Sequence, residues 1–388
     1  MNLSGSKVNV DSKKPNLVII ELDYHAEILT TMCPLLANYF NVYLITTEKI
    51  WQKARSCEGS LSGVAVKSKK QKIRQFIDSQ HQMLDAADLV YFNTLQKFTR
   101  FFSSFHFNCK TVWRIHNLNS MFLPKQSLAI GQVSLGKILY HLIARVFIGG
   151  RWRTQQKMLA RTDYFMAPST GIMQAFFDAH PTVKNSRWLP FVVPFSPIAT
   201  DVSRSPKQDS YVIAVTGTVD PIRKDYDFLY RVILQLRKNS PKPIELHFLG
   251  GPQGKPAVAV LERFKKLNND NTKIFTPNGY VSDEHVASIM ATATCMIAPI
   301  QLKTTFKVYR EVYGFSKVSG FENDIRRYAV PCFYPKTYRI DDSLKALSFG
   351  YKDENNLVSQ LLALNEEKIL EPTLDGVEED LMRFRALI

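Results

Sequence analysis

Two segments in the second half of the chain combine glycine, hydroxyl and basic side chains in patterns that suit an anionic ligand. The first segment follows the apolar run 211–215. It holds Gly217 and Thr218, and then Arg223 and Lys224. Glycine lets the backbone approach a ligand closely, while arginine offers a fork of donors to a phosphate and lysine a point charge. The pattern favours a nucleoside diphosphate, and a solvated loop is the alternative.

The second segment is a turn at residues 314–320, directly before a stretch of helical character at 321–328. It carries two serines, a lysine and a terminal glycine: Ser316, Lys317, Ser319 and Gly320. The free N–H groups of a helix N-terminus bind anions, serine hydroxyls donate hydrogen bonds, and lysine neutralises a phosphate. A diphosphate at this turn is the main interpretation, and a capping serine in a surface turn is the alternative.

Other residues of this half fit the ribose and the base of a nucleotide. Glu322 and Asp324 lie in the first turn of the expected helix, where a carboxylate can accept hydrogen bonds from ribose hydroxyls. A favourable interaction with the helix dipole explains either residue equally well. Two further strands end in turns whose backbone groups are accessible to the edge of a base, and these turns contain Gly250, Gly279, Tyr280 and Val281.

The candidate chemistry of the first half follows two apolar strands. His116 comes after the run 111–115, and an imidazole there can exchange protons near neutral pH or hydrogen-bond a sugar hydroxyl. Glu21, Asp23 and His25 follow the first strand, and Asp23 is the alternative base for activating an acceptor hydroxyl. A purely structural role for His116 is as compatible with the sequence as a functional one.

Short apolar runs alternate with helix-length stretches along the first half. We expect strands at 16–22, 42–45, 89–92, 111–115 and 164–167, and helices at 73–87 and 134–161, the second interrupted near Gly150. Ser169 can cap a helix that begins near Gly171. Strands separated by helices predict a parallel sheet, and ligands bind such sheets at the carboxyl ends of the strands.

A second alternating series predicts strands at 211–215, 245–249, 273–275, 295–298 and 332–334. The prolines at positions 190, 194 and 197 mark a linker between the two series. The fold class is therefore α/β, with two Rossmann-like domains at residues 1–199 and 200–388 that face each other across a cleft. The last helix, expected at 376–388, can pack back on the first domain.

The net charge of +15 is unevenly distributed along the chain. Residues 1–200 hold 24 Lys and Arg against 11 Asp and Glu, an excess of 13, whereas residues 201–388 hold 26 against 24, an excess of 2. Such asymmetry indicates that the first half meets an anionic partner, such as a membrane surface, a lipid phosphate or nucleic acid, or it serves only solubility. The stretch 137–157 is cationic and amphipathic, which favours lipid head groups.

Five scattered cysteines without metal-ligand spacing indicate a reducing compartment. The polar N-terminal stretch and the lack of a run of about 20 apolar residues predict a cytoplasmic protein, peripheral at most on the inner face of the cell membrane.

The order of these features resembles that of bacterial glycosyltransferases of the GT-B fold, over roughly residues 16–335. The resemblance rests on residues 114–117 (Arg-Ile-His-Asn), 161–169, 189–190 (Leu-Pro), 216–217, 223–224 and 278–281. The commoner family pattern has two glutamates around the turn at 314–320. Here Tyr313 stands at the first position and Asp324 near the second, so the turn is more similar to a Ser-Lys-x-Ser-Gly subgroup of polysaccharide synthesis.

The resemblance implies transfer of a sugar from a nucleoside-diphosphate sugar to a saccharide or lipid-linked saccharide in cell-surface polysaccharide synthesis. The second domain would hold the donor, with Asp324 on the ribose, and the first would hold the acceptor, with His116 near the transferred sugar. No cofactor and no metal are expected, because cations of the chain stabilise the departing diphosphate. Two alternatives are a nucleic-acid-binding protein, for which no motif is found, and a sugar-nucleotide epimerase or hydrolase on the same fold.

Overall fold

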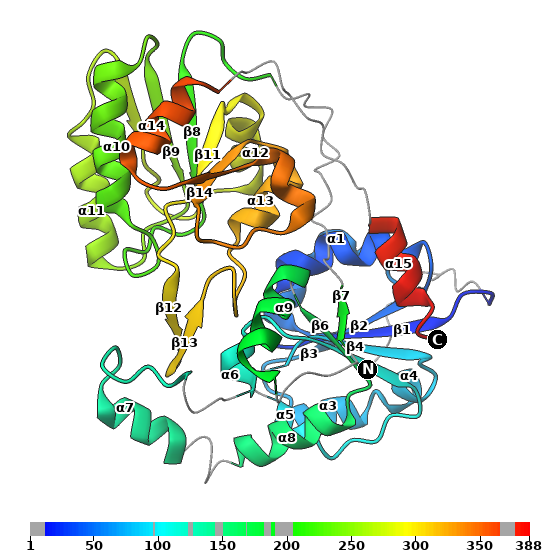
Figure 1. Ribbon diagram of the computed structural model, residues 1–388. Helices are drawn as coiled ribbons and strands as arrows, with labels where there is room; N and C mark the ends of the chain where they lie inside the picture. The colour runs from blue at the N-terminus through cyan, green and yellow to red at the C-terminus, as the bar shows by residue number, and fades with distance from the viewer. Residues whose placement is uncertain are drawn as a thin grey trace. The chain divides into compact units, whose positions relative to one another are not determined.

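The structure is a computed structural model that describes residues 12–95, 98–122, 127–143, 150–167, 169–181, 188–190, 205–364 and 377–388. The chain folds as two compact α/β units (Figure 1). Unit 1 comprises residues 1–194, 305–310 and 374–388, and unit 2 comprises residues 195–304 and 311–373. Most of the expected proline-rich linker lies outside the described residues.

Unit 1 is built on a seven-stranded parallel sheet with the order β3-β2-β1-β4-β5-β6-β7. The strands are β1 (Asn16–Glu21), β2 (Asn41–Thr47), β3 (Gly63–Lys67), β4 (Leu89–Thr94), β5 (Lys110–Arg114), β6 (Tyr164–Ala167) and β7 (Trp188–Pro190). The strand order reverses between β1 and β4, so the carboxyl ends of these two strands flank the topological switch point at which open α/β sheets bind ligands.

Helices lie on both faces of this sheet (Figure 1). The helices of unit 1 are α1 (Ala26–Ala37), α2 (Glu48–Ala54), α3 (Ile73–Asp78), α4 (His81–Asp85), α5 (Thr99–Phe102), α6 (Leu118–Phe122), α7 (Leu135–Tyr140), α8 (Arg151–Arg161), α9 (Thr170–Ala179) and α15 (Val377–Arg385), with a 3₁₀ turn at Arg55–Ser60. Of these, α7 lies apart from the sheet (Figure 1). Ser169 caps α9 by accepting a hydrogen bond from Ile172 N, as expected. In the C-terminal helix α15, Phe384 packs edge-on against Phe40 and Tyr91 of the same unit.

Both helical stretches expected in the first half are divided in the structure, and the second is interrupted at Gly150 as expected. The stretch 73–87 is divided into α3 and α4 at Ser79, whose hydroxyl donates to Phe76 O at 2.7 Å and so competes with the helical hydrogen bonds. The stretch 134–161 contains the separate helices α7 and α8. Gly150, directly before α8, has φ of 63°, a left-handed conformation that interrupts a helix.

Unit 2 is built on a six-stranded sheet with the order β10-β9-β8-β11-β14-β15, in which all described pairs are parallel. The strands are β8 (Tyr211–Thr216), β9 (Ile244–Leu249), β10 (Thr272–Phe275), β11 (Cys295–Ile297), β14 (Cys332–Pro335) and β15 (Ser348–Tyr351). The helices are α10 (Tyr226–Asn239), α11 (Lys255–Lys265), α12 (Asp283–Thr292), α13 (Phe321–Tyr328) and α14 (Glu354–Leu362), with a 3₁₀ turn at Asp342–Leu347. The order reverses between β8 and β11, so the turn after β8 lies at the switch point.

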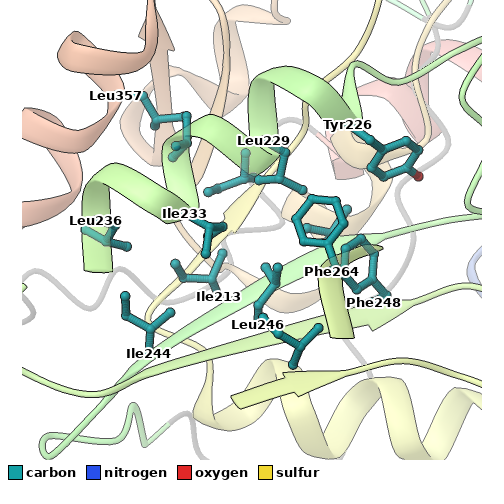
Figure 2. Close-up of a cluster of buried hydrophobic side chains, with 14 of the residues drawn as sticks. Ile213, Tyr226, Leu229, Ile233, Leu236, Ile244, Leu246, Phe248, Phe264 and Leu357 are labelled. Atoms are coloured by element: carbon teal, nitrogen blue, oxygen red, sulfur yellow. The ribbon is translucent and has the colours of Figure 1, made fainter. Parts of the chain in front are cut away.

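The hydrophobic core of unit 2 fixes the strands and helices that flank the turn after β8. Ile213 and Leu246 of the central strands meet Leu229 and Ile233 of α10, and Phe264 of α11 and Leu357 of α14 extend the same cluster (Figure 2). A second cluster packs α12 and α13 on the sheet through Met290, Phe321 and Ile325. Both faces of the sheet are therefore covered by apolar side chains, and ligand access is confined to its edges and ends.

A feature that the sequence did not predict is the two-stranded sheet of β12 (Lys303–Phe306) and β13 (Tyr309–Val312). Its tip, residues 305–310, is part of unit 1, where Val308 and Tyr309 are buried with Ile138 of α7. The alternation of strands and helices in the sequence does not predict a hairpin whose tip belongs to the other unit. β3 and β15 were also not predicted, and β7 was indicated only by the resemblance at residues 189–190. The other strands of the two large sheets lie within a few residues of the expected positions.

Candidate functional site

Three glycine-containing turns pack backbone to backbone at the carboxyl ends of β8, β9 and β10. A Cβ on Gly250 would lie 2.3 Å from Gly217 O, and a Cβ on Gly251 would lie 2.6 Å from Gly279 O. Gly217 has φ of 71°, which also favours glycine. No side chain fits between the turns, so their peptide groups line the carboxyl end of the sheet. Gly217, Thr218 and Gly279 are exposed there.

Lys224 closes the first of these turns from within. Its Nζ donates to three carbonyls, Thr216 O at 2.5 Å, Gly217 O at 3.0 Å and Thr218 O at 3.1 Å. All three ammonium donors are thus directed at the backbone, and burial lowers the pKa of Lys224 to about 8. Lys224 therefore shapes the turn and places a positive charge behind it, rather than reaching outward as the sequence suggested.

Arg223 is the outward cation of this turn. Its side chain is half-exposed, and its Nε lies 3.3 Å from Asp220 Oδ2. Asp220 Oδ1 also accepts a hydrogen bond from Ile222 N at 2.9 Å, so the carboxylate is held by the turn and in turn orients the guanidinium. The five donors of arginine leave it able to bind a phosphate while it keeps this ion pair.

Asp324 connects helix α13 with the end of β8. It lies in the first turn of α13, and its carboxyl group is hydrogen-bonded to the side chain of Thr216. Burial raises the pKa of Asp324, and that hydrogen bond and the charge of Lys224 oppose the increase. The two segments that the sequence singled out are therefore joined. The charge of Asp324 raises the pKa of Lys224, and the charge of Lys224 lowers the pKa of Asp324.

The turn at residues 314–320 is fixed by buried groups. Gly314 has φ of 76°, and a Cβ there would lie 2.5 Å from Arg339 N. Ser316 is fully buried, its hydroxyl donates to Glu311 Oε2 at 2.6 Å, and it accepts a hydrogen bond from Val312 N at 3.0 Å. The expectation that the Ser316 hydroxyl points to a ligand does not hold in this structure, because it serves the turn itself.

Lys317 and Gly320 are the accessible members of this turn. Gly320 is exposed directly before α13, and Lys317 is half-buried with its Nζ 5.9 Å from the ring centre of Tyr313. Desolvation lowers the pKa of Lys317 to about 8, the charge of Glu311 opposes the shift, and the nearby positive charge of Arg223 adds to it. Gln301 N donates to Arg223 O and Tyr313 N donates to Leu302 O, both at 2.8 Å, so Arg223 and Lys317 from the two separate segments lie in the same region of unit 2.

Two buried carboxylates, those of Glu311 and Glu322, lie next to the turn at residues 314–320. Glu311 was missed from the sequence, because a lone glutamate in a short strand carries no motif. Glu322 is fully buried beside Tyr338, whose hydroxyl donates to its Oε1, and its Oε2 lies 3.5 Å from Arg326 Nη1. Burial raises the pKa of Glu322 to about 7. Ser319, also buried, donates its N–H to Tyr338 Oη at 3.2 Å.

A pocket of about 740 Å³ adjoins the third glycine turn. It includes Asn278, Tyr280 and Val281 from the turn after β10, together with Phe275 and His247. The His247 ring stacks on Phe275 with the ring centres 4.2 Å apart, and Tyr280 is 89% exposed at the rim. Of the residues expected to meet a base, Tyr280 and Val281 line this concave surface with aromatic walls, whereas Gly250 and Gly279 do not.

The candidate residues of unit 1 form a separate group at its switch point. The rings of His25 and His116 stack with centres 4.3 Å apart, and His116 Nε2 lies 3.1 Å from Asn93 O. Glu21 is fully buried and accepts hydrogen bonds from Asp23 N at 2.8 Å and from Asn93 Nδ2 at 2.7 Å, and burial raises its pKa. The structure thus brings the candidate residues of β1 and β5 together.

Acidic residues in the described ranges are not arranged for a metal. The structure has no group of three or more His, Cys, Asp or Glu there that could hold an ion. Asp225 and Asp227, two residues apart after the first turn, are both engaged. Asp225 caps α10 by accepting from Phe228 N at 2.8 Å, and Asp227 pairs with Arg263.

Several solved structures share this arrangement of two parallel sheets. Anabaena HepE in complex with UDP is 10% identical, with a TM-score of 0.57 over 96% of this chain and 94% of its own. The catalytic domain of starch synthase IV from Arabidopsis thaliana, bound to ADP and acarbose, is 9% identical, with a TM-score of 0.58 over 96% and 98%. WaaG, a glycosyltransferase involved in lipopolysaccharide biosynthesis, is 12% identical, with a TM-score of 0.51 over 96% and 93%.

No protein-family model and no curated protein matches the sequence. At such low identity the structural likeness establishes the fold, and it confirms the α/β class and the GT-B fold expected from the order of motifs. The chemistry has to be argued from the residues of this chain.

Proposed function

We propose that this chain is a hexosyltransferase-like glycosyltransferase that uses a nucleoside-diphosphate sugar as donor and needs no metal. The observation that carries the proposal is that two backbone hydrogen bonds, from Gln301 N to Arg223 O and from Tyr313 N to Leu302 O, bring the turns of Arg223 and Lys317 to the glycine-lined carboxyl end of the unit 2 sheet. Two cations and exposed peptide groups at a topological switch point are the features that a diphosphate requires.

The donor is assigned to unit 2 by the chemistry of each position. The diphosphate would meet Arg223, Lys317 and the N–H groups around Gly320, with Lys224 supplying charge from behind the turn. Asp324 would accept hydrogen bonds from the ribose, and the pocket beside Tyr280 would take the base. An aromatic-walled pocket next to a cationic turn supports a nucleotide over a simple phosphate or sulfate.

Catalysis would consist chiefly of stabilising the departing diphosphate. Negative charge grows on the leaving group as the glycosidic bond breaks. Arg223, held beforehand by Asp220, and Lys317, whose charge is favoured by Glu311, would stabilise that charge without reorganisation. Unit 1 would supply the acceptor side, where His116 contacts the transferred sugar and Asp23 is the alternative base. Because cations of the chain perform the role of a metal, the reaction is proposed to be metal-independent.

The acceptor is proposed to be a saccharide or a lipid-linked saccharide of a cell-surface polysaccharide. The first half of the chain carries most of the net positive charge, which favours a phosphate-bearing acceptor at the cytoplasmic face of a membrane. Across the described parts of the chain, no helix has the length and apolar character needed to cross a bilayer.

The alternatives predict different products. A nucleic-acid-binding protein has no use for the pocket and cationic turns of unit 2, which disfavours that reading. An epimerase or a hydrolase on the same fold would share the donor site but would act on the donor without an acceptor. Product analysis therefore separates these enzymes from a transferase.

The test is incubation of the protein with UDP-, ADP- and GDP-hexoses, with and without a bacterial lipid extract as acceptor. The proposal expects release of the nucleoside diphosphate that depends on the extract, and a labelled sugar that moves into the extract. Free sugar released without acceptor would identify a hydrolase, and an altered sugar on an intact donor would identify an epimerase. Either result, or inertness towards all donors, would overturn the proposal.

A further inference from the structure

An apolar stripe on helix α7 and the residues directly after it faces solvent in unit 1. Leu135, Leu139 and Ile143 follow each other at intervals of four residues and are 66%, 47% and 51% exposed. Tyr140 beside them is 62% exposed, and Ile130 before the helix is 63% exposed. Single exposed apolar residues are ordinary on a soluble protein, but a contiguous group of this kind marks a surface that meets a partner.

The opposite face of α7 is anchored to the tip of the β12–β13 hairpin. Ile138 is buried with Val308 and Tyr309, and the ring of His141 packs edge-on against Tyr309 at 5.9 Å. The segment before α7 is fixed in the same way, because Ala129 N donates to Val308 O at 2.8 Å. The exposed stripe is therefore held outward by a built support and is not the loose end of a frayed helix.

Positive charge surrounds the stripe. Lys137 of α7 and Arg310 of the hairpin are exposed, and Lys307 lies at the hairpin tip. Arg310 also donates to Ile130 O at 3.1 Å, which fixes it next to an exposed apolar residue. No Asp or Glu occurs between Leu89 and Thr162, a stretch with eleven basic residues: Lys97, Arg100, Lys110, Arg114, Lys125, Lys137, Arg145, Arg151, Arg153, Lys157 and Arg161.

We infer that α7 and the hairpin tip, residues 130–143 and 305–310, form a surface that inserts into the interface of an anionic lipid bilayer. An apolar stripe bordered by cations, without any acidic residue, is complementary to acyl chains beneath negatively charged head groups. Tyr140 has the amphipathic ring that favours the boundary between the two layers. A protein partner would need an acidic rim around an apolar patch to match the same surface.

This inference goes beyond the proposed reaction, because it names the residues that enter the lipid and needs no donor for its test. The charge asymmetry of the sequence pointed to the basic stretch 137–157 as a whole. The structure instead assigns insertion to the exposed side of α7 together with a hairpin that lies far away in the sequence.

The test is flotation of the full chain with vesicles of phosphatidylcholine alone, or with about one third phosphatidylglycerol. We expect binding to the anionic vesicles only, and a decrease of at least about tenfold for the double variant Leu135→Ser, Leu139→Ser. The matched control is Val258→Ser, Met382→Ser, which removes two apolar side chains that are 46% and 52% exposed elsewhere. Thermal unfolding of each variant establishes that it is folded.

Insertion itself is read from Tyr140→Trp, whose fluorescence should shift to the blue on anionic vesicles. An unshifted spectrum, or wild-type binding by the double serine variant, would overturn the inference. So would a dimer in lipid-free solution that the double variant converts to a monomer, because the stripe would then join two copies of the chain. Nucleoside diphosphate binding by the same variant is measured in parallel, so failure here is distinguishable from failure of the proposed function.

Discussion

The carboxylate of Glu311 and the hydroxyl of Ser316, both fully buried, are joined by a hydrogen bond of 2.6 Å that fixes the start of the turn at residues 314–320. The same carboxylate opposes the decrease in the pKa of Lys317 that burial causes. One buried group thus sets both the shape of the turn and the charge that it presents.

Replacing Glu311 should destabilise unit 2. Glu311→Ala leaves the Ser316 hydroxyl buried without its acceptor, which costs about 1–3 kcal/mol of unfolding free energy. Glu311→Gln retains an acceptor and should cost less. Stability is measured by urea unfolding. The wild type, Glu311→Ala, Ser316→Ala and the double variant together give the coupling energy between the two positions. A coupling energy of zero would remove the support that we assign to this pair.

Gly250→Ala should disturb the donor edge of unit 2. The added Cβ would lie 2.3 Å from Gly217 O, so the turns after β8 and β9 must separate, at a cost of about 1–3 kcal/mol. Weaker nucleotide binding should accompany the loss of stability. Gly59→Ala is the control, because a Cβ there has no neighbour within 4 Å. Equal unfolding free energies for the two variants would show that the turns do not need their close contact.

Nucleotide affinity should decrease as the pH is raised from about 7 to about 9. Lys317 has a pKa lowered by burial to about 8, so it loses its charge in this interval, and the bound diphosphate must then recruit a proton. Lys317→Arg keeps its charge throughout and should give a flatter profile, measured by calorimetry. The remaining slope would belong to Lys224, whose pKa is also about 8. Identical slopes in both proteins would exclude Lys317 from the site.

Glu322 should make the protein less stable as the pH increases. Burial raises its pKa to about 7 in the folded state, above the usual value near 4.5, so the folded protein binds the extra proton between these values. Stability is greatest below the unfolded pKa and decreases up to about pH 7, by at most about 1.4 kcal/mol per pH unit. Glu322→Gln should flatten this part of the urea-unfolding profile, and an unchanged slope would be contrary to our account.

His116→Ala should impair sugar transfer and leave nucleotide binding intact. Removal of a group that exchanges protons with the reacting sugar typically lowers the rate by about 10²–10⁴. Asp23→Asn, measured beside it in the same transfer assay, distinguishes which of the two residues serves as base. Loss of nucleotide affinity in His116→Ala would instead indicate a structural role for its stack with His25.

The sequence was informative where chemistry follows an apolar strand. Arg223, Lys224 and Asp324 could be singled out because glycine, cations and a helix start have a fixed order at the end of a parallel strand. The inward direction of Lys224 and Ser316 could not be predicted, because it depends on three carbonyls and on Glu311, which spacing does not bring together. The apolar stripe on α7 was hidden for the same reason. The face of α7 that is buried packs on Val308 and Tyr309, which are well over a hundred residues away in the sequence.

The most direct test of the donor site is calorimetric titration of UDP, ADP and GDP into three proteins. These are the wild type, Arg223→Ala with Lys317→Ala, and Lys238→Ala, an exposed control at the far end of α10. We predict that at least one nucleotide binds the wild type and the control equally, and that the double variant loses about 100-fold or more in affinity through two charge-assisted contacts. Equal affinity in all three proteins, or no binding of any nucleotide to the wild type, would contradict a diphosphate site in unit 2.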